Sequence, residues 1–255
     1  IRMLKKVIFW FFVLCMFAYG VYTALNIASE ARIEFVLDRC LFECLPLMGL
    51  ISAIFTSLFI GSEYSDGTIR NKIIVGHSRI RIYLANLIVC AIASVLISLS
   101  YIVGVFVIGN MNGGELITET ATIFLCMISS LMISITFASI MTLLAILNTN
   151  KAGNVVVSMI LALVLLVSGS FIHQKLGEPK LYDNYVTVNE MGIPTQVEQL
   201  PNPQYIEGTP RIVLEVLSDL LPSGQAIQLA DAFDTEGMAD ESIANAPYRW
   251  MRYSL

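Results

Sequence analysis

The chain has 255 residues, of which 56% are hydrophobic and only 14% are charged. Soluble domains carry about 25% charged residues, so this composition excludes an ordinary soluble domain and predicts an all-α, polytopic helical membrane protein. The formal net charge is −5, but most of the acidic excess follows residue 173 and does not describe the apolar part of the chain.

Five apolar runs are long enough to cross a bilayer, which takes about 20 helical residues. They are Val7–Ile27, Leu41–Gly61, Tyr83–Gly109, Ala121–Leu147 and Val155–His173. The first run lacks a clear cleavage site and is followed by further spans, so we do not interpret it as a signal peptide. We therefore expect residues 1–173 to form a transmembrane domain with five spans.

Two ionisable residues fall inside these runs, Glu43 in the first turn of the second span and His173 at the end of the fifth. Ionisable groups in spans are costly and are therefore candidates for a functional role, although both residues are close enough to a span end to reach the interface. Pro46 is expected to weaken the helix beside Glu43.

Small residues recur at four-residue spacing in two of the spans. The second span carries Gly49, Ala53, Ser57 and Gly61, and the fourth carries Ser130, Ser134, Ala138 and Thr142. Such stripes let helices approach closely in lipid, so we predict that both faces are buried against other helices.

The connector between the second and third spans, residues 62–82, is charged and must lie in water. Asp66-Gly67 is a turn signal, and Thr68 to Val75 then has the pattern of a short amphipathic helix. We expect Ile69, Ile73 and Ile74 on one side of this helix. A structured helix at the membrane surface suggests a contact.

Orientation follows from basic residues in the short connections. Eight lie on the side that holds the amino terminus and residues 62–82, and two, Arg32 and Arg39, lie on the other side. Because cytoplasmic loops are enriched in Lys and Arg, the amino terminus is predicted to be cytoplasmic and residues 174–255 extracytoplasmic.

Residues 174–255 read as a small external subdomain. Thr209 is a candidate cap for a helix ending near Leu221, and Ser223 for a second helix through Phe233. The acidic residues Asp231, Asp234, Glu236, Asp240 and Glu241 match no calcium-binding loop and are interpreted as a solvated face. The aromatic and basic stretch from Tyr248 to Leu255 favours a sixth span beyond it, in a sequence cut at both ends.

No motif for cofactor, metal or ATP chemistry is present. The sequence lacks GxxxxGK[ST], GxGxxG, HExxH and GxSxG, and its five cysteines have no metal-ligand spacing. We therefore expect no enzymatic activity, no cofactor and no metal site in this chain, and the few basic residues do not suggest nucleic acid.

The segment Glu63-Tyr-Ser-Asp-Gly-Thr-Ile-Arg-Asn-Lys72, followed by Ser78-Arg79 and Tyr83-Leu-Ala-Asn-Leu87, resembles the first cytoplasmic loop of permease subunits of type 2 ABC exporters. In that family a glutamate that ends the second span and the short coupling helix after it meet the ATP-binding subunit. The resemblance implies a coupling role for Glu63, Tyr64, Asp66, Gly67, Thr68, Arg70, Asn71 and Lys72.

The resemblance implies that the chain is the membrane permease of an ATP-driven exporter in the cell membrane. Its expected partners are a separate ABC-type ATP-binding subunit, a second permease subunit in a homo- or heterodimer, and membrane lipid. The alternative is a membrane binding or immunity protein of the same fold that does not transport. A more distant rival, an intramembrane enzyme, has only Glu43 and His173 as candidate groups.

Overall fold

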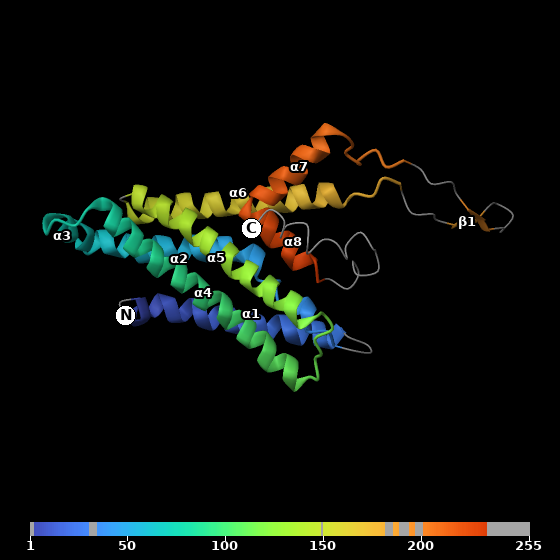
Figure 1. Cartoon of the computed structure of the whole chain (residues 1–255), viewed down its shortest axis with the longest axis horizontal. Helices are drawn as coiled ribbons and strands as arrows, with labels where there is room; N and C mark the ends of the chain where they lie inside the picture. Colours follow the sequence, from blue (N-terminus) through green and yellow to red (C-terminus); the bar gives the residue numbers. More distant parts are fainter. Residues whose placement is uncertain are drawn as a thin grey trace.

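The computed structural model describes residues 3–30, 35–148, 150–181, 186–188, 194–196 and 201–233. Its five long helices are α1 (Val7–Glu30), α2 (Leu45–Ser65), α4 (Arg79–Met111), α5 (Thr120–Leu147) and α6 (Lys151–Gly177). Each is long and apolar enough to span a membrane, which confirms the predicted all-α polytopic fold with five candidate spans (Figure 1).

The remaining described elements are short. They are the 3-10 turns η1 (Met3–Lys5) and η2 (Asp38–Cys40), the helices α3 (Thr68–Ile74), α7 (Thr209–Leu220) and α8 (Pro222–Asp231), and the strands β1 (Val186–Val188) and β2 (Pro194–Gln196). The two strands pair antiparallel, with Thr187 opposite Thr195, and lie beyond the end of α6 (Figure 1). This hairpin was not predicted from the sequence.

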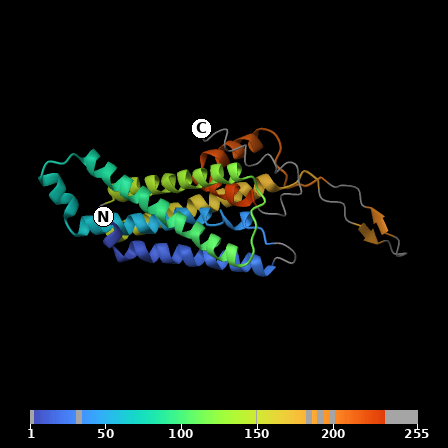
Figure 2. The same cartoon turned by 60° about the horizontal axis from the view of Figure 1, so that its bottom comes forward.

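Helix α2 is the centre of the bundle. It packs against α5 and α6, while α4 packs against α1 and α5 (Figure 2). Among the five long helices α2 is the most buried, and α6 is the least buried. The element that leads into the charged connector is therefore held by its neighbours on several sides.

The contact between α1 and α4 depends on two glycines outside the predicted stripes. A Cβ atom on Gly104 would lie 2.5 Å from the carbonyl oxygen of Phe17, and one on Gly20 would collide with the carbonyl oxygen of Tyr101. The two backbones can come this close only because glycine has no side chain. In lipid the hydrophobic effect does not drive helices together, so close packing with many dispersion contacts stabilises the pair instead.

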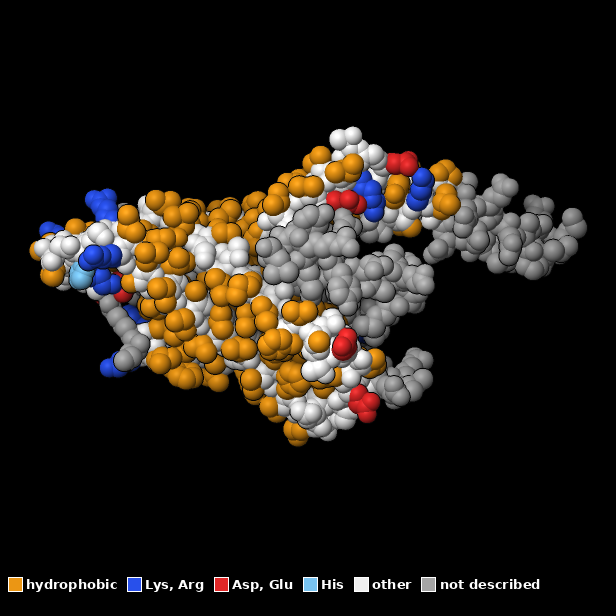
Figure 3. All heavy atoms as spheres, viewed as in Figure 1, with side chains coloured by type: hydrophobic (Ala, Val, Ile, Leu, Met, Phe, Trp, Pro, Cys, Tyr) orange, Lys and Arg blue, Asp and Glu red, His pale blue; other side chains and the backbone are white. Residues whose placement is uncertain are grey.

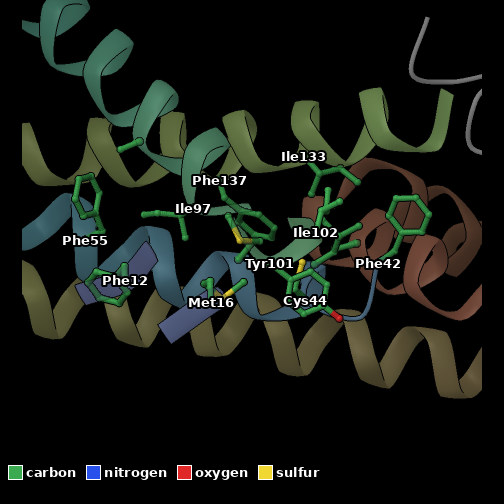
Figure 4. Packing of buried hydrophobic residues seen from close by; sticks show 14 of the residues in the cluster. Phe12, Met16, Phe42, Cys44, Phe55, Ile97, Tyr101, Ile102, Ile133 and Phe137 are labelled. Carbon is green, nitrogen blue, oxygen red and sulfur yellow. The ribbon is translucent and has the colours of Figure 1, made fainter. Parts of the chain in front are cut away.

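Tyr101 ties α4 to the segment between α1 and α2 (Figure 4). Its side chain is fully buried, and its hydroxyl donates to the carbonyl oxygen of Cys40 over 2.6 Å. The Oγ1 atom of Thr23 on α1 lies 3.1 Å from the same hydroxyl. A buried phenol is stable there because its polar atom is hydrogen-bonded.

The segment before α2 differs from the prediction. Glu43 lies outside α2, which begins at Leu45, and Pro46 occupies the first turn, where a missing N–H costs no helical hydrogen bond. Proline therefore helps to start this helix and does not weaken it. The buried acid of the segment is Asp38, whose Oδ2 accepts from the backbone N–H groups of Ile117 and Thr118 at 3.1 and 2.7 Å.

The predicted caps of the two short helices are wrong. The residue before α7 is Gly208, with φ of 77°, and the residue before α8 is Leu221, and neither makes a side-chain cap. Pro210 and Pro222 fill the first turns, where their fixed φ suits a helix start. Helix α8 adds Leu229 to the bundle core, and the turn after it adds Phe233, whose ring lies 5.0 Å from that of Phe42.

Candidate functional site

The charged connector folds as a tight turn followed by α3. The N–H of Asp66 donates to the carbonyl oxygen of Ser62 over 2.9 Å and ends α2. Gly67 then adopts φ of 66°, in the left-handed region that favours glycine, and α3 begins at Thr68, which is half-buried. The predicted Asp66-Gly67 turn thus separates α2 from α3 within two residues.

An ion pair joins α3 to α2. The Nζ atom of Lys72 lies 3.0 Å from Oε2 of Glu63, whose side chain is only 4% exposed, whereas that of Lys72 is about one-third exposed. Glu63 is therefore turned into the protein and is not displayed on the surface. Because the two residues are nine positions apart and lie on different helices, sequence spacing gave no direct sign of this pair.

A second basic residue, Lys6, reaches the same place from the segment before α1. Its Nζ donates to Oγ of Ser62 over 3.2 Å and lies 4.0 Å from Oδ2 of Asp66. Lys6 is one of the eight basic residues from which the orientation was predicted, and its contact with α2 was not predicted. The contact places the start of the chain against the end of α2.

The end of α2 is also held by α5 and α6. The hydroxyl of Tyr64 donates to the carbonyl oxygen of Ile146 over 2.8 Å. On the neighbouring face, a Cβ atom on Gly61 would lie 2.8 Å from Cγ of Lys151 at the start of α6. The end of α2 is thus in contact with α3, α5 and α6.

The outward face of α3 is both apolar and cationic. Ile69 is buried, but Ile74 and Val75 are 72% and 78% exposed, and Arg70 and Asn71 are exposed as well. Of the three isoleucines that were predicted to share one side of this helix, only Ile69 is buried, whereas Ile73 is 43% exposed. Basic side chains gather at this end of the molecule (Figure 3).

The two stripes of small residues lie inside the bundle. All eight residues are buried: Gly49, Ala53, Ser57 and Gly61 on α2, and Ser130, Ser134, Ala138 and Thr142 on α5. A Cβ atom on Gly49 would lie 2.9 Å from the ring of Phe137 on α5. The α2 stripe thus meets α5 at one end and α6 at the other.

The two ionisable residues that were predicted within spans lie at the opposite end of the bundle from α3. Glu43 lines an open pocket of about 190 Å³ together with Arg39, Ile227, Ala230 and Asp231. His173 Nε2 lies 3.0 Å from Oδ2 of Asp231, and this hydrogen bond holds the pKa of the Asp231 carboxyl below its usual value. Of the predicted acidic face, only Asp231 is among the described residues, and Asp234, Glu236, Asp240 and Glu241 lie outside them, as does the stretch from Tyr248.

Within the described part of the chain, no three His, Cys, Asp or Glu side chains are grouped so that they could hold a metal ion. The charged connector presents the exposed side chains of α3 beside the nearly buried carboxylate of Glu63 and its ion pair with Lys72.

A family model described as ABC-2 family transporter protein matches residues 2–169, which include all five long helices except the end of α6. Comparisons with curated proteins and with solved structures found no significant match.

Proposed function

Because the chain belongs to the ABC-2 transporter family, we propose that it is the membrane permease of an ATP-driven exporter and that α3 is its coupling helix. The family makes it a permease subunit of an ABC transporter and implies an ABC-type ATP-binding subunit as its partner. The direction of transport and the role of α3 are the parts that we add.

The observation that carries the coupling role is the ion pair between Glu63 and Lys72. A helix that transmits a displacement must be fixed to the span next to it, here α2. An ion pair with a buried carboxylate resists separation more than an exposed pair does. We infer that α3 and the end of α2 move as one unit.

The partner would meet the outward face of α3. Ile74 and Val75 offer apolar area, and Arg70 and Asn71 offer donors beside it. Contact sites commonly combine an apolar centre with a polar rim in which Arg is enriched. We propose that Tyr64, Asp66, Gly67 and Thr68 position this face and do not form it.

The packing of α2 supports transmission into the membrane. Small side chains let α2 lie close to α5 and α6. A displacement of α2 would therefore also displace the side chains of both neighbouring helices. We propose that the exporter contains two permease subunits and that α2 shifts between two arrangements as the ATP-binding subunits close.

Orientation gives the first test, because ATP-binding subunits act in the cytoplasm. In a variant with exposed Cys15 replaced by serine, a cysteine at Ser65 should react with a membrane-impermeant thiol reagent only in opened cells. A cysteine at Glu207, at the other end of the molecule, should react in intact cells. Cysteines at both positions are accessible, because Ser65 and Glu207 are exposed. The four other native cysteines are buried and should therefore add little background reaction.

Reaction of the Ser65 cysteine in intact cells would put α3 outside, where no ATP-binding subunit could reach it, and the proposal would fail. The parent variant without an added cysteine gives the background.

A further inference from the structure

Four buried residues form a polar cluster inside the bundle, where α2, α4 and α5 meet. They are Thr56 on α2, Asn86 and Cys90 on α4, and Thr142 on α5, and none of them is more than 3% exposed. The side chains of Thr56 and Thr142 both lie beside the Cys90 thiol. Asn86 precedes Cys90 by four residues and therefore lies on the same side of α4, one turn nearer to α3. We refer to these four residues as the polar cluster.

The polar cluster belongs to a longer row of polar groups between α2 and α4. Glu63 follows Thr56 by seven residues, on the same side of α2, and lies close enough to act electrostatically on the Cys90 thiol. In the other direction, one turn farther from α3, Oγ of Ser52 lies 3.3 Å from Oγ of Ser94. From Ser52 to Glu63 the row is about 16 Å long, at 1.5 Å per helical residue.

Three atoms of the polar cluster lack a hydrogen-bond partner within the described part of the chain. They are Oγ1 of Thr56, Oγ1 of Thr142 and Nδ2 of Asn86. The thiol of Cys90 beside the two hydroxyls is only a weak donor and acceptor. Because buried polar atoms in proteins are almost always paired with protein or with ordered water, these three atoms indicate a partner that is not part of the chain.

Other hydroxyls of α5 show that a partner within the helix is available. Ser130, Ser134 and Ser139 each donate to a backbone carbonyl oxygen three or four residues earlier, over 2.7 to 2.9 Å. Thr142 makes no such bond, and its side chain lies toward Cys90 on α4 instead. The unpaired hydroxyls are therefore directed at the contact between helices and not at their own backbone.

We propose that ordered water molecules occupy the polar cluster and bridge Thr56, Asn86 and Thr142. The occupant must accept from Nδ2 of Asn86, which can only donate, and water can accept there and also donate to the hydroxyl oxygens. A metal cation accepts no hydrogen bond, and the described residues contain no group of three His, Cys, Asp or Glu side chains that could hold one. Buried water typically makes about three hydrogen bonds to groups of this kind.

Water would enter the polar cluster from the end of the bundle that carries α3. The row of polar groups ends there at Glu63 and its partner Lys72, whose side chain is about one-third exposed. Bridging water can form new hydrogen bonds after a small displacement, so it would let α2 shift against α4 and α5 without leaving polar groups unpaired. The inference requires only that the long helices span a membrane and does not rest on the coupling role of α3.

Reaction with silver ions tests the proposal on the unsubstituted chain in lipid nanodiscs, because a silver ion is close to water in size and binds thiols. After exposure, the chain is unfolded, the thiols that remain free are alkylated, and each cysteine is quantified by mass spectrometry. Cys126 is the internal control. It is also fully buried, but it lies six residues from the start of α5, whereas Cys90 lies eleven residues from the start of α4.

Depth in the membrane alone would make Cys126 the faster of the two thiols. Because access controls the reaction of a thiol, we expect Cys90 to react about tenfold faster than Cys126 if water reaches the polar cluster. Equal rates, or a faster reaction of Cys126, would overturn the proposal.

A double substitution, Thr56→Val with Thr142→Val, tests whether the hydroxyls hold the water. Valine keeps the shape of threonine and removes the polar atom, so the rate at Cys90 should fall to that of Cys126. Ser134→Ala is the matched control, since the Ser134 hydroxyl is paired within α5, and it should leave the rate at Cys90 unchanged. An undiminished rate in the double variant, with Cys126 still slow, would overturn the assignment of the water to these hydroxyls.

Discussion

Replacing Lys72 by methionine is expected to reduce ATP hydrolysis by the assembled transporter about tenfold or more. The substitution keeps the length of the side chain but removes the cation that lies 3.0 Å from the nearly buried carboxylate of Glu63. Breaking a buried pair costs about 3–5 kcal/mol. Because Lys72 is one-third exposed, we expect its removal to cost about half of that free energy. A cost of 1.4 kcal/mol lowers the population of the paired arrangement of α2 and α3, and with it the rate of ATP hydrolysis, about tenfold.

The matched control is Lys180→Met. Lys180 pairs with Glu207 at 2.8 Å, but both side chains are more than 60% exposed and lie far from α3. An exposed pair contributes little, so this variant should keep wild-type ATP hydrolysis. Adding Glu63→Gln to Lys72→Met removes the uncompensated charge and should restore part of the activity. Equal activities for both lysine variants would refute the role of the ion pair.

Replacing Gly67 by valine is expected to separate membrane insertion from coupling. Gly67 has φ of 66°, which a β-branched residue adopts only with strain of about 1–3 kcal/mol. No atom lies within 4 Å of a Cβ placed there, so the cost comes from the backbone alone. We expect normal insertion but weak recovery of the ATP-binding subunit when the permease is purified.

Gly113→Val provides the comparison for this strain. Gly113 has φ of 69°, and its Cβ position is equally open, but it lies in the loop between α4 and α5 at the other end of the bundle. It should suffer the same local strain and still recover the ATP-binding subunit. Equal recovery by the two variants would show that the conformation of the turn before α3 does not matter for assembly.

The sequence predicted the long helices and the turn well because both depend on local signals. Five apolar runs of spanning length can only be helices in lipid, and Asp66-Gly67 followed by an amphipathic segment predicted α3. The boundaries were less certain at Glu43 and Pro46, because a proline can start a helix as readily as disturb one, and hydropathy alone does not show which.

Contacts between distant residues could not be read from spacing. The pair of Glu63 with Lys72 joins α2 to α3 across a turn, and the hydrogen bond from Tyr64 to Ile146 joins α2 to α5. Gly20 and Gly104 bring α1 and α4 together without any repeat that would mark them. For α7, the sequence indicated a helix, but periodicity could not show which side of it faces the protein, since that depends on the surrounding medium.

Photo-crosslinking measures directly the proposed contact between α3 and an ATP-binding subunit. A benzophenone amino acid replaces Ile74, which is 72% exposed on α3, and in a control it replaces Met111, which is 76% exposed at the far end of α4. After illumination of cells, we predict an adduct from position 74 whose partner contains the phosphate-binding motif GxxxxGK[ST], and no such adduct from position 111. Failure of position 74 to give this adduct, with the permease correctly inserted, would contradict the account.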